Sequence, residues 1–306
     1  PCLRCNKCHG RGPHDPFVSV CSVNPEYGLE HQLKKMAPAP VTEPRKVAVI
    51  GGGPAGMEAA QVAANRGHKV TLFEKTGELG GQLIPASVPD FKWTLKNFKD
   101  YMVRKTLENA NIEVRFNTEA KPGELSGFDK VIVAIGAEPI ILPLPGVDGK
   151  NVMTGIDALL HPERVKGKVA VIGGGEIGVE VGMFLAKKGH PSTVLEMRDM
   201  LAADATPIHY YNMVRDAWEA TEGFSSILKA KVTGITDAGV TYTDETGESK
   251  IVEADTVILS VGTRSKRDEA YAFYAPGAET TVIGDALAVK TVQGAMRTGY
   301  AAGNNA

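Results

Sequence analysis

The chain has 306 residues, a formal net charge of −2 at pH 7 and a hydrophobic fraction of 43%. The near-neutral charge argues against nucleic acid or a membrane surface as the main partner. The apolar stretches are short and are broken by glycine or proline, and none approaches the roughly 20 residues that a transmembrane helix needs. We therefore expect a soluble protein, and the length is sufficient for two domains that each bury a core.

All four cysteines lie within the first 21 residues, at Cys2, Cys5, Cys8 and Cys21. Three thiolates spaced three residues apart in a short loop can reach three corners of a cubane, while a fourth returns from outside the loop. Structural zinc sites are the main alternative, but they usually pair two C-x-x-C knuckles across a longer spacer. The overlapping C-x-x-C-x-x-C arrangement therefore favours a 4Fe-4S cluster over zinc or over unligated or disulfide-bonded cysteines. His9 and His14 could be ligands, but with four thiols present we expect them to pack or to be solvated.

The confinement of cysteine to this motif also indicates the compartment. A secreted chain would be expected to spread disulfides through its domains, so the pattern suits a reducing, cytoplasmic environment. No cysteine follows Cys21. Disulfide chemistry of the thioredoxin-reductase kind is therefore excluded for the rest of the chain.

A glycine-rich motif occurs twice after the proline-rich segment 36–44. The apolar segment 46–50 leads into GGGPAG, and the segment 168–172 leads into GGGEIG. In such G-x-G-x-x-G loops the first glycine allows a tight strand-to-helix turn, the second lets the backbone approach a pyrophosphate, and the third lets the helix pack on the sheet. The diphosphate then lies at the helix N-terminus, where unpaired amides and the helix dipole favour an anion. Each loop therefore predicts a dinucleotide site.

Each copy continues to a second strand that ends in a glutamate, Glu74 in the first copy and Glu196 in the second. A carboxylate at this position accepts hydrogen bonds from the ribose hydroxyls of a dinucleotide. The alternative is an ordinary α/β turn followed by a solvated glutamate. The same spacing separates Gly51 from Gly173 and Glu74 from Glu196. This repetition of a whole unit favours two binding sites.

The surroundings of the first copy predict that it binds FAD. Segment 77–83, GELGGQL, is a second glycine-rich turn that can lie against an extended cofactor. Near the C-terminus a short strand delivers Asp285 before a predicted helix from about Val292 to Ala302. An acid there suits a polyol such as the ribityl chain, with the helix start directed at the flavin's pyrimidine edge, although Asp285 could instead only cap that helix. The expected FAD site comprises Gly51, Gly53, Pro54, Ala55, Gly56, Glu74, Lys75, Gly81, Gln82, Ala134, Gly284, Asp285 and Val292.

The second copy is expected to bind the nicotinamide nucleotide. Glu196 can accept from the free 2′-hydroxyl of NADH but would repel the 2′-phosphate of NADPH. Arg198 is the counter-argument, because a guanidinium can bind that phosphate in a bidentate fork. We therefore expect NADH, with NADPH as the alternative, while Glu180 either faces the nicotinamide pocket or, as we expect, is an exposed helix residue. The expected site comprises Gly173, Gly175, Glu176, Ile177, Gly178, Glu196, Arg198 and Gly262.

Two further apolar segments, 129–139 and 255–265, end in glycine turns and mark the passages of the chain between two domains. The sequence therefore predicts an α/β protein with two Rossmann-like dinucleotide-binding domains and an N-terminal iron–sulfur segment. We expect the iron–sulfur segment at 1–40, the FAD-binding domain at 41–140 and 265–306, and the NAD(P)H-binding domain at 141–264. No hydrolase constellation accompanies them, so we assign no catalytic side chain.

With these motifs the sequence resembles the two-dinucleotide flavoprotein fold of glutathione reductase and its relatives. With CLRCNKC and CSVNPEYG in front, it resembles more narrowly the C-terminal half of the NADH:flavin oxidoreductases related to old yellow enzyme, a family that includes 2,4-dienoyl-CoA reductase, 2-enoate reductase and trimethylamine dehydrogenase. In that family an N-terminal β/α barrel carries FMN and the substrate site, and the cluster loop follows it. The barrel is absent here. The resemblance thus implies a fragment of a longer, homo-oligomeric enzyme or a separately encoded electron-input subunit.

Two departures distinguish members of this family. The C-x-x-C-x-x-C spacing is similar to that of trimethylamine dehydrogenase. That enzyme has a degenerate second fingerprint and holds only ADP in the first site, whereas GGGEIG is intact here and is followed by an acid. A working nicotinamide site is therefore expected.

The resemblance implies a path for the electrons. NADH passes hydride to FAD, and single electrons then move through the cluster to FMN in the barrel, which reduces an activated C=C bond such as that of an enoate or dienoyl substrate. One alternative is a stand-alone FAD and iron–sulfur subunit that serves a separate reductase. Another is an ADP-binding structural domain of an amine dehydrogenase.

Overall fold

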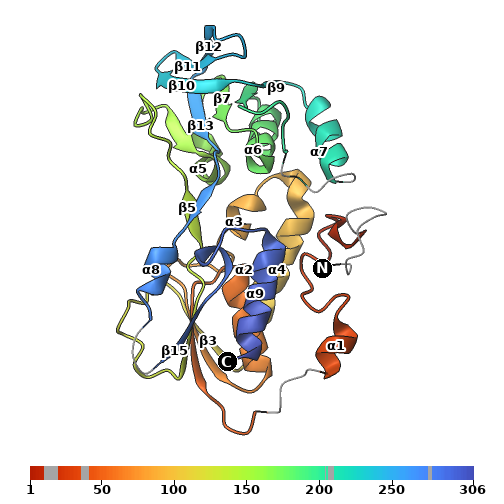
Figure 1. Cartoon of the computed structure of the whole chain (residues 1–306), viewed down its shortest axis with the longest axis vertical. Coiled ribbons are helices and arrows are strands. Elements are labelled where there is room, and N and C mark those ends of the chain that lie inside the picture. The colour runs from red at the N-terminus through yellow and green to blue at the C-terminus, as the bar shows by residue number, and fades with distance from the viewer. Residues whose placement is uncertain (10–19, 36–40, 204, 206–209, 275–277) are drawn as a thin grey trace. The chain divides into compact units, whose positions relative to one another are not determined.

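A computed structural model of the chain describes residues 1–9, 20–35, 41–203, 205, 210–274 and 278–306. The chain divides into two compact units, one formed by Pro1–Glu138 with Arg264–Ala306 and the other by Pro139–Thr263. Each unit contains a five-stranded sheet (Figure 1). Among the described residues, no helix is long and apolar enough to cross a membrane.

The sheet of the first unit has the strand order β15-β4-β1-β2-β3, and all neighbouring strands are parallel. The central strands are buried almost throughout, because apolar side chains cover both of their faces. The strands are β1 (Lys46–Ile50), β2 (Lys69–Phe73), β3 (Ile112–Arg115), β4 (Lys130–Val133) and β15 (Glu279–Val282).

Three helices lie together over one face of this sheet: α2 (Pro54–Asn65), α4 (Trp93–Leu107) and α9 (Val292–Asn304) (Figure 1). Helix α9 approaches α2 closely because glycine lines the contact. A Cβ on Gly299 would lie 2.5 Å from the backbone oxygen of Ala55. Leu3 and Val23 of the cysteine-rich segment pack against the same core. The shorter helices of this unit are α1 (Glu30–Lys35), α3 (Leu83–Ala86) and α8 (Arg267–Tyr271), with 3-10 turns at Lys7–His9, Asp90–Lys92 and Gly284–Ala286.

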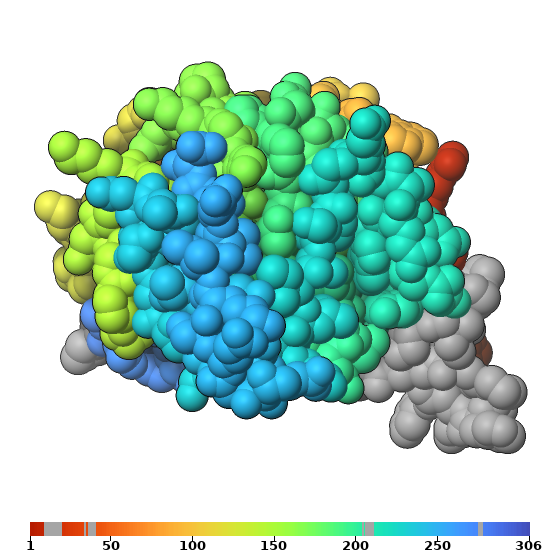
Figure 2. Space-filling view, turned by 90° about the horizontal axis from the view of Figure 1, so that it is seen from above, coloured from red at the N-terminus to blue at the C-terminus, as the bar shows by residue number. Residues whose placement is uncertain are grey.

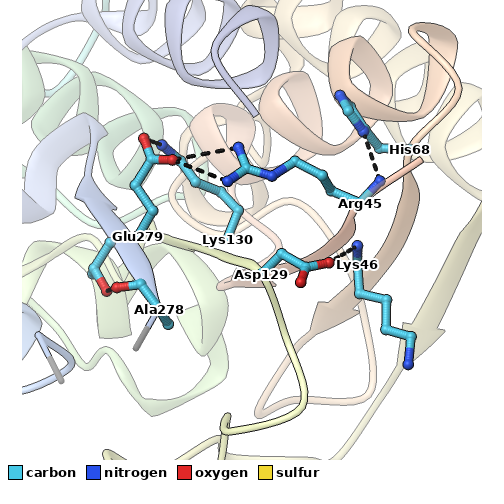
Figure 3. Close-up of polar contacts among 8 residues, drawn as sticks. Arg45, Lys46, His68, Asp129, Lys130, Ala278 and Glu279 are labelled. Carbon is cyan, nitrogen blue, oxygen red and sulfur yellow. Dashed lines mark hydrogen bonds and ion pairs between the residues drawn. The ribbon is translucent and has the colours of Figure 1, made fainter. Parts of the chain in front are cut away.

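A polar cluster joins the starts of β4 and β15 (Figure 3). Lys130 is 2% exposed, and its Nζ lies 2.5 Å from Oε1 of Glu279. Arg45 donates from both terminal nitrogens to Oε2 of the same carboxylate at 3.3 Å. The main-chain N–H of Arg45 also donates to Nδ1 of the buried His68 at 3.1 Å. These contacts fix β15, which leads directly to the 284–285 turn, against its neighbour in the sheet.

The second unit repeats this arrangement, with a parallel sheet of strand order β6-β13-β7-β8-β9. Its strands are β6 (Val152–Thr154), β7 (Val169–Ile172), β8 (Ser192–Leu195), β9 (Phe224–Ile227) and β13 (Thr256–Leu259). Its helices are α5 (Gly155–Leu160), α6 (Glu176–Lys187) and α7 (Tyr210–Glu219), with a 3-10 turn at Pro162–Arg164. An antiparallel sheet of β10 (Lys231–Thr236), β11 (Gly239–Thr243) and β12 (Ser249–Glu253) completes the unit. Residues of this small sheet form much of the surface seen in cyan and blue in Figure 2.

The predicted segments 129–139 and 255–265 are each divided into two strands. β4 is followed by β5 (Ala137–Pro139), and β13 is followed by β14 (Thr263–Ser265). The breaks contain Gly136 and Gly262, whose φ angles of +78° and +99° interrupt an extended strand. β5 and β14 pair with each other, and the chain passes between the units within them.

Candidate functional site

The first glycine loop turns from β1 into α2 with a backbone that only glycine fits. Gly51 has a φ of +101°, and a Cβ there would lie 2.5 Å from the backbone oxygen of Ala134. A Cβ on Gly56 would lie 1.9 Å from the backbone oxygen of Gly51, so the third glycine lets α2 pack on the turn. The helix begins at Pro54 after Gly53, without a side-chain cap. Its first-turn amides are therefore left to a ligand.

Two turns that are distant in sequence lie against this loop. Gly81 has a φ of +52°, and a Cβ there would lie 2.9 Å from Cα of Gly53. Gly284 has a φ of +60°, and a Cβ there would lie 2.8 Å from Cβ of Ala55. The structure thus brings the fingerprint, the turn before Gln82 and the turn before Asp285 together, as a single extended cofactor would require. The role of each residue in holding FAD stays a prediction.

The carboxylate of Glu74 is held by main-chain and hydroxyl donors. Its side chain belongs to a residue that is 7% exposed, and Oε2 accepts from the N–H of Gly52 at 2.8 Å. Oε1 accepts from both the N–H and the hydroxyl of Thr76, each at 2.8 Å. A carboxylate oxygen has two lone pairs, so Glu74 is oriented by these bonds and its Oε2 can still accept from a ribose hydroxyl. Lys75, which follows it, is exposed.

Asp285 does not cap α9. Burial raises the pKa of Asp285, and the N–H of Lys290, which donates to Oδ1 at 3.0 Å, partly offsets that effect. Helix α9 starts at Val292, and its N-cap residue Thr291 makes no side-chain capping bond. Both the acid and the open helix start are therefore available to a ligand, and the capping alternative for Asp285 is wrong.

The turn that carries Asp285 is clamped by side chains from β14 and α8. The Ser265 hydroxyl donates to the backbone oxygen of Ala286 at 2.8 Å. Arg267 donates to the backbone oxygen of Leu287 from Nε at 2.9 Å and from Nη2 at 2.5 Å. This clamp could not be predicted from the sequence, because its donors are separated from their acceptors by about twenty residues of unrelated pattern.

The second glycine loop has the same geometry within its own unit. Gly173 has a φ of +103°, and a Cβ there would lie 2.4 Å from the backbone oxygen of Ser260. A Cβ on Gly178 would lie 1.9 Å from the backbone oxygen of Gly173. Gly175 is the N-cap residue of α6 and makes no side-chain cap. Ser260 therefore occupies the place that Ala134 has in the first unit, and no motif of the sequence predicted this role for Ser260.

Glu196 is held as Glu74 is. Its Oε2 accepts from the N–H of Gly174 at 2.6 Å, and its Oε1 accepts from the N–H of Arg198 at 2.8 Å. Each fingerprint thus has its own strand-end carboxylate, hydrogen-bonded to the middle glycine of its loop. The two fingerprints differ two residues later, where the first copy has the hydroxyl of Thr76 and the second has a guanidinium.

A later turn bonds back to the loop in both units. Gly80 donates its N–H to the backbone oxygen of Gly52 at 2.9 Å, and Ala202 donates to the backbone oxygen of Gly174 at 2.7 Å. The glycines of GELGGQL predicted the first turn. Ala202 has a φ of +48°, a conformation that non-glycine residues rarely adopt. The second turn was therefore not visible in the sequence.

The remaining predicted nucleotide residues lie around the second loop. Glu176 and Ile177 open α6, and Ile177 is 51% exposed. The carbonyl of Gly262 accepts from the N–H of Ile140 at 3.0 Å. Glu180 is partly buried, and our expectation of an exposed residue is wrong, because residues on nearly all sides of α6 are covered.

None of the four cysteines forms a disulfide. Arg4 and Asn6, which lie between the first three, have φ angles of +56° and +54°. Left-handed residues of this kind turn main-chain amides into concavities that suit anions. Among the described residues, no group of three or more His, Cys, Asp or Glu side chains is arranged to hold a metal ion. The cluster therefore stays a prediction, and the side chain of His9 and the whole of His14 lie outside the described part.

Within the described part of the chain, three sulfurs of the motif have hydrogen-bond partners. Cys2 accepts from the N–H of Arg4 at 3.2 Å, and Cys21 accepts from the N–H of Val23 at 3.5 Å. The hydroxyl of Ser22 lies 3.1 Å from Sγ of Cys5. Such contacts suit thiolates better than thiols, since a thiolate is the stronger acceptor.

Comparison with known proteins identifies the family. Residues 45–304 match the family described as pyridine nucleotide-disulphide oxidoreductase. The chain belongs to this family. It is 35% identical over 315 residues to cinnamate reductase of Clostridium sporogenes. This match covers 100% of this chain and 45% of that protein. It is 34% identical over 307 residues to an NADH oxidase of Thermoanaerobacter brockii. That match covers 98% of this chain and 46% of the oxidase. Among solved structures, 2-naphthoyl-CoA reductase matches with a TM-score of 0.87 and 28% identity over 94% of this chain and 44% of the other.

These matches confirm the predicted fold and the class of flavin oxidoreductase, and family membership supports the binding of FAD and NAD(H). They also confirm the resemblance to the reductases related to old yellow enzyme. The chain spans about half the length of the curated relatives that it matches.

Proposed function

We propose that this chain is the electron-input module of an ene-reductase-type enzyme. It takes electrons from NADH into FAD and passes them through a 4Fe-4S cluster to an FMN-carrying β/α barrel. The observation that carries the proposal is that the same arrangement occurs in both units of the chain. In each unit a glycine loop is hydrogen-bonded to the glutamate at the end of the following strand. A cinnamate reductase and an NADH oxidase of about twice the length support a further domain with the substrate site.

In the first unit, different side chains and main-chain amides would bind different parts of FAD. The uncapped start of α2 takes the diphosphate, and Glu74 takes the adenosine ribose. Asp285 takes the ribityl hydroxyls, and its clamped turn keeps the acid in place. Bound FAD would supply the chemistry, accepting a hydride from the nicotinamide and releasing electrons one at a time.

In the second unit, the fixed carboxylate favours NADH. Both oxygens of Glu196 are bonded to main-chain amides, so the side chain cannot easily swing away from the ribose position. A 2′-phosphate would meet this charge directly. The guanidinium of Arg198 is the group that could bind a 2′-phosphate and so favour NADPH. NADPH is therefore the nucleotide to compare with NADH.

The cysteine segment has the donor set for a 4Fe-4S cluster. A cubane takes one thiolate at each of four irons, so its ligand sulfurs need not converge on a single point. The four thiols lie on a segment whose Leu3 and Val23 pack against the core to which α2, α4 and α9 contribute. An electron acceptor held there would be attached to the same unit as the FAD site. The acceptor beyond it would be the FMN of the barrel, in an enzyme that we propose is homo-oligomeric and acts on an activated C=C bond.

The proposal is tested by purifying the chain without oxygen and measuring flavin, iron and sulfide. We expect one FAD and about four irons and four sulfides per chain. One zinc without iron would overturn the cluster and leave the flavin module. Tightly bound ADP in place of flavin would overturn the module itself and indicate the structural domain of an amine dehydrogenase.

A further inference from the structure

Ser22, which follows the last cysteine of the motif, contacts the sulfur of Cys5. Its Oγ lies 3.1 Å from Sγ of Cys5, and the two residues are separated by 17 positions in the chain. Ser22 is 8% exposed, so bulk water has little access to this hydroxyl. The contact is therefore a tertiary one, made where the chain returns to the motif at Cys21.

The direction of this hydrogen bond follows from the state of the cysteine. A metal-bound cysteine is a thiolate, which has no proton and can only accept. The hydroxyl of Ser22 must then be the donor. A hydrogen bond to a charged acceptor is stronger than one between neutral groups, and shielding from water strengthens it further.

Among the described residues, the other hydrogen bonds to sulfur in this motif come from the main chain. Arg4 and Val23 donate their N–H groups to Cys2 and Cys21. Ser22 differs because its donor is a side-chain hydroxyl, which a single substitution removes while the backbone stays as it is.

We infer that Ser22 raises the reduction potential of the cluster by donating to the Cys5 thiolate, an inference that rests on the proposed cluster. Reduction adds negative charge to the cluster and its sulfurs. A donor stabilises the reduced form more than the oxidised form, and hydrogen bonds to the sulfurs are among the factors that set the potential of such clusters. Ser22 thus acts through Cys5, and it adjusts how readily the cluster accepts an electron from the flavin.

The test is an anaerobic redox titration of the full chain, with the reduced cluster followed by electron paramagnetic resonance. In Ser22→Ala we expect the ratio of reduced to oxidised cluster at a fixed potential to fall by about threefold to tenfold, a negative shift of about 28 to 59 mV for one electron. Ser22→Thr keeps the hydroxyl and should stay near the wild-type potential. Thr94→Val is the matched control, because the Thr94 hydroxyl holds the same segment through the backbone oxygen of Leu3, at 3.1 Å, and not through a sulfur. Its potential should be unchanged.

An iron-loaded Ser22→Ala protein with the wild-type potential would overturn the inference, and so would an equal shift in Thr94→Val. If Ser22→Ala does not retain iron, Ser22→Val and Ser22→Thr provide an isosteric pair. A lower potential in the valine variant supports the inference. Loss of the cluster in both Ala and Val, with retention in Thr, would show a role in holding the cluster and not in setting its potential. A wild-type chain without iron would overturn the proposed cluster itself.

Discussion

The ion pair between Lys130 and Glu279 gives a quantitative prediction for the first unit. Lys130 is 2% exposed, whereas the Glu279 side chain is 55% exposed. Removing one partner of a fully buried pair costs about 3 to 5 kcal/mol because the other charge is stranded, and an exposed pair contributes about 0 to 1 kcal/mol. The pair is therefore intermediate between these two cases, because water reaches the Glu279 carboxylate but not the Lys130 ammonium. We therefore expect Glu279→Ala to lower the free energy of unfolding by about 2 kcal/mol, between these two limits.

Urea unfolding followed by circular dichroism measures this loss. Arg45→Ala is the matched control, because Arg45 contacts the same carboxylate but its side chain is 40% exposed, and it should cost less than about 1 kcal/mol. In Lys130→Met the buried charge is removed, so adding Glu279→Ala to that variant should cost much less than Glu279→Ala alone. Equal losses for Arg45→Ala and Glu279→Ala, or full additivity in the double variant, would refute the argument that the stranded lysine carries the cost.

Three further predictions concern the cofactor sites and pH. Replacing Asp285 or Glu74 by Ala should lower FAD occupancy of the purified chain, measured by absorbance after desalting; full retention in both variants would contradict the FAD assignment. Burial and the Glu26 carboxylate raise the pKa of Glu58 from 4.5 to about 7. The folded chain therefore binds this proton more tightly than the unfolded chain, and the associated stability is lost as the pH rises from 4.5 through about 7. Glu58→Gln should thus be more stable than wild type at pH 8 and similar to it at pH 5, and urea midpoints with the same pH dependence in both proteins would count against this. With Glu196 at the ribose, rapid mixing should show NADH preferred over NADPH by about tenfold to a hundredfold, and faster flavin reduction by NADPH would reverse the assignment.

The glycine loops and strand-end acids could be predicted because their information is local. Gly56 is required by a contact with the backbone oxygen of Gly51 in the same strand–turn–helix unit, and Gly51 has the positive φ angle that the turn itself needs. The repeat at Gly173 and Glu196 then made the prediction specific, since a second copy of the same spacing is hard to explain by an ordinary turn.

The missed features depend on contacts that no local pattern encodes. Ala202 replaces a glycine in the second turn, so a search for glycine could not find it. Arg267 and Ser22 are ordinary polar residues whose partners are set by the folded chain. The burial of Glu180 depends on the elements packed around α6, which the spacing of the motif does not reveal.

The most direct test of the proposed electron-input role is anaerobic rapid mixing of the purified chain with NADH while flavin absorbance is recorded. The account predicts that NADH bleaches the bound flavin, with a rate that saturates as the nucleotide concentration increases. This should occur without any barrel domain, because both proposed nucleotide sites lie within this chain. A flavin that dithionite bleaches but neither NADH nor NADPH reduces would contradict the account.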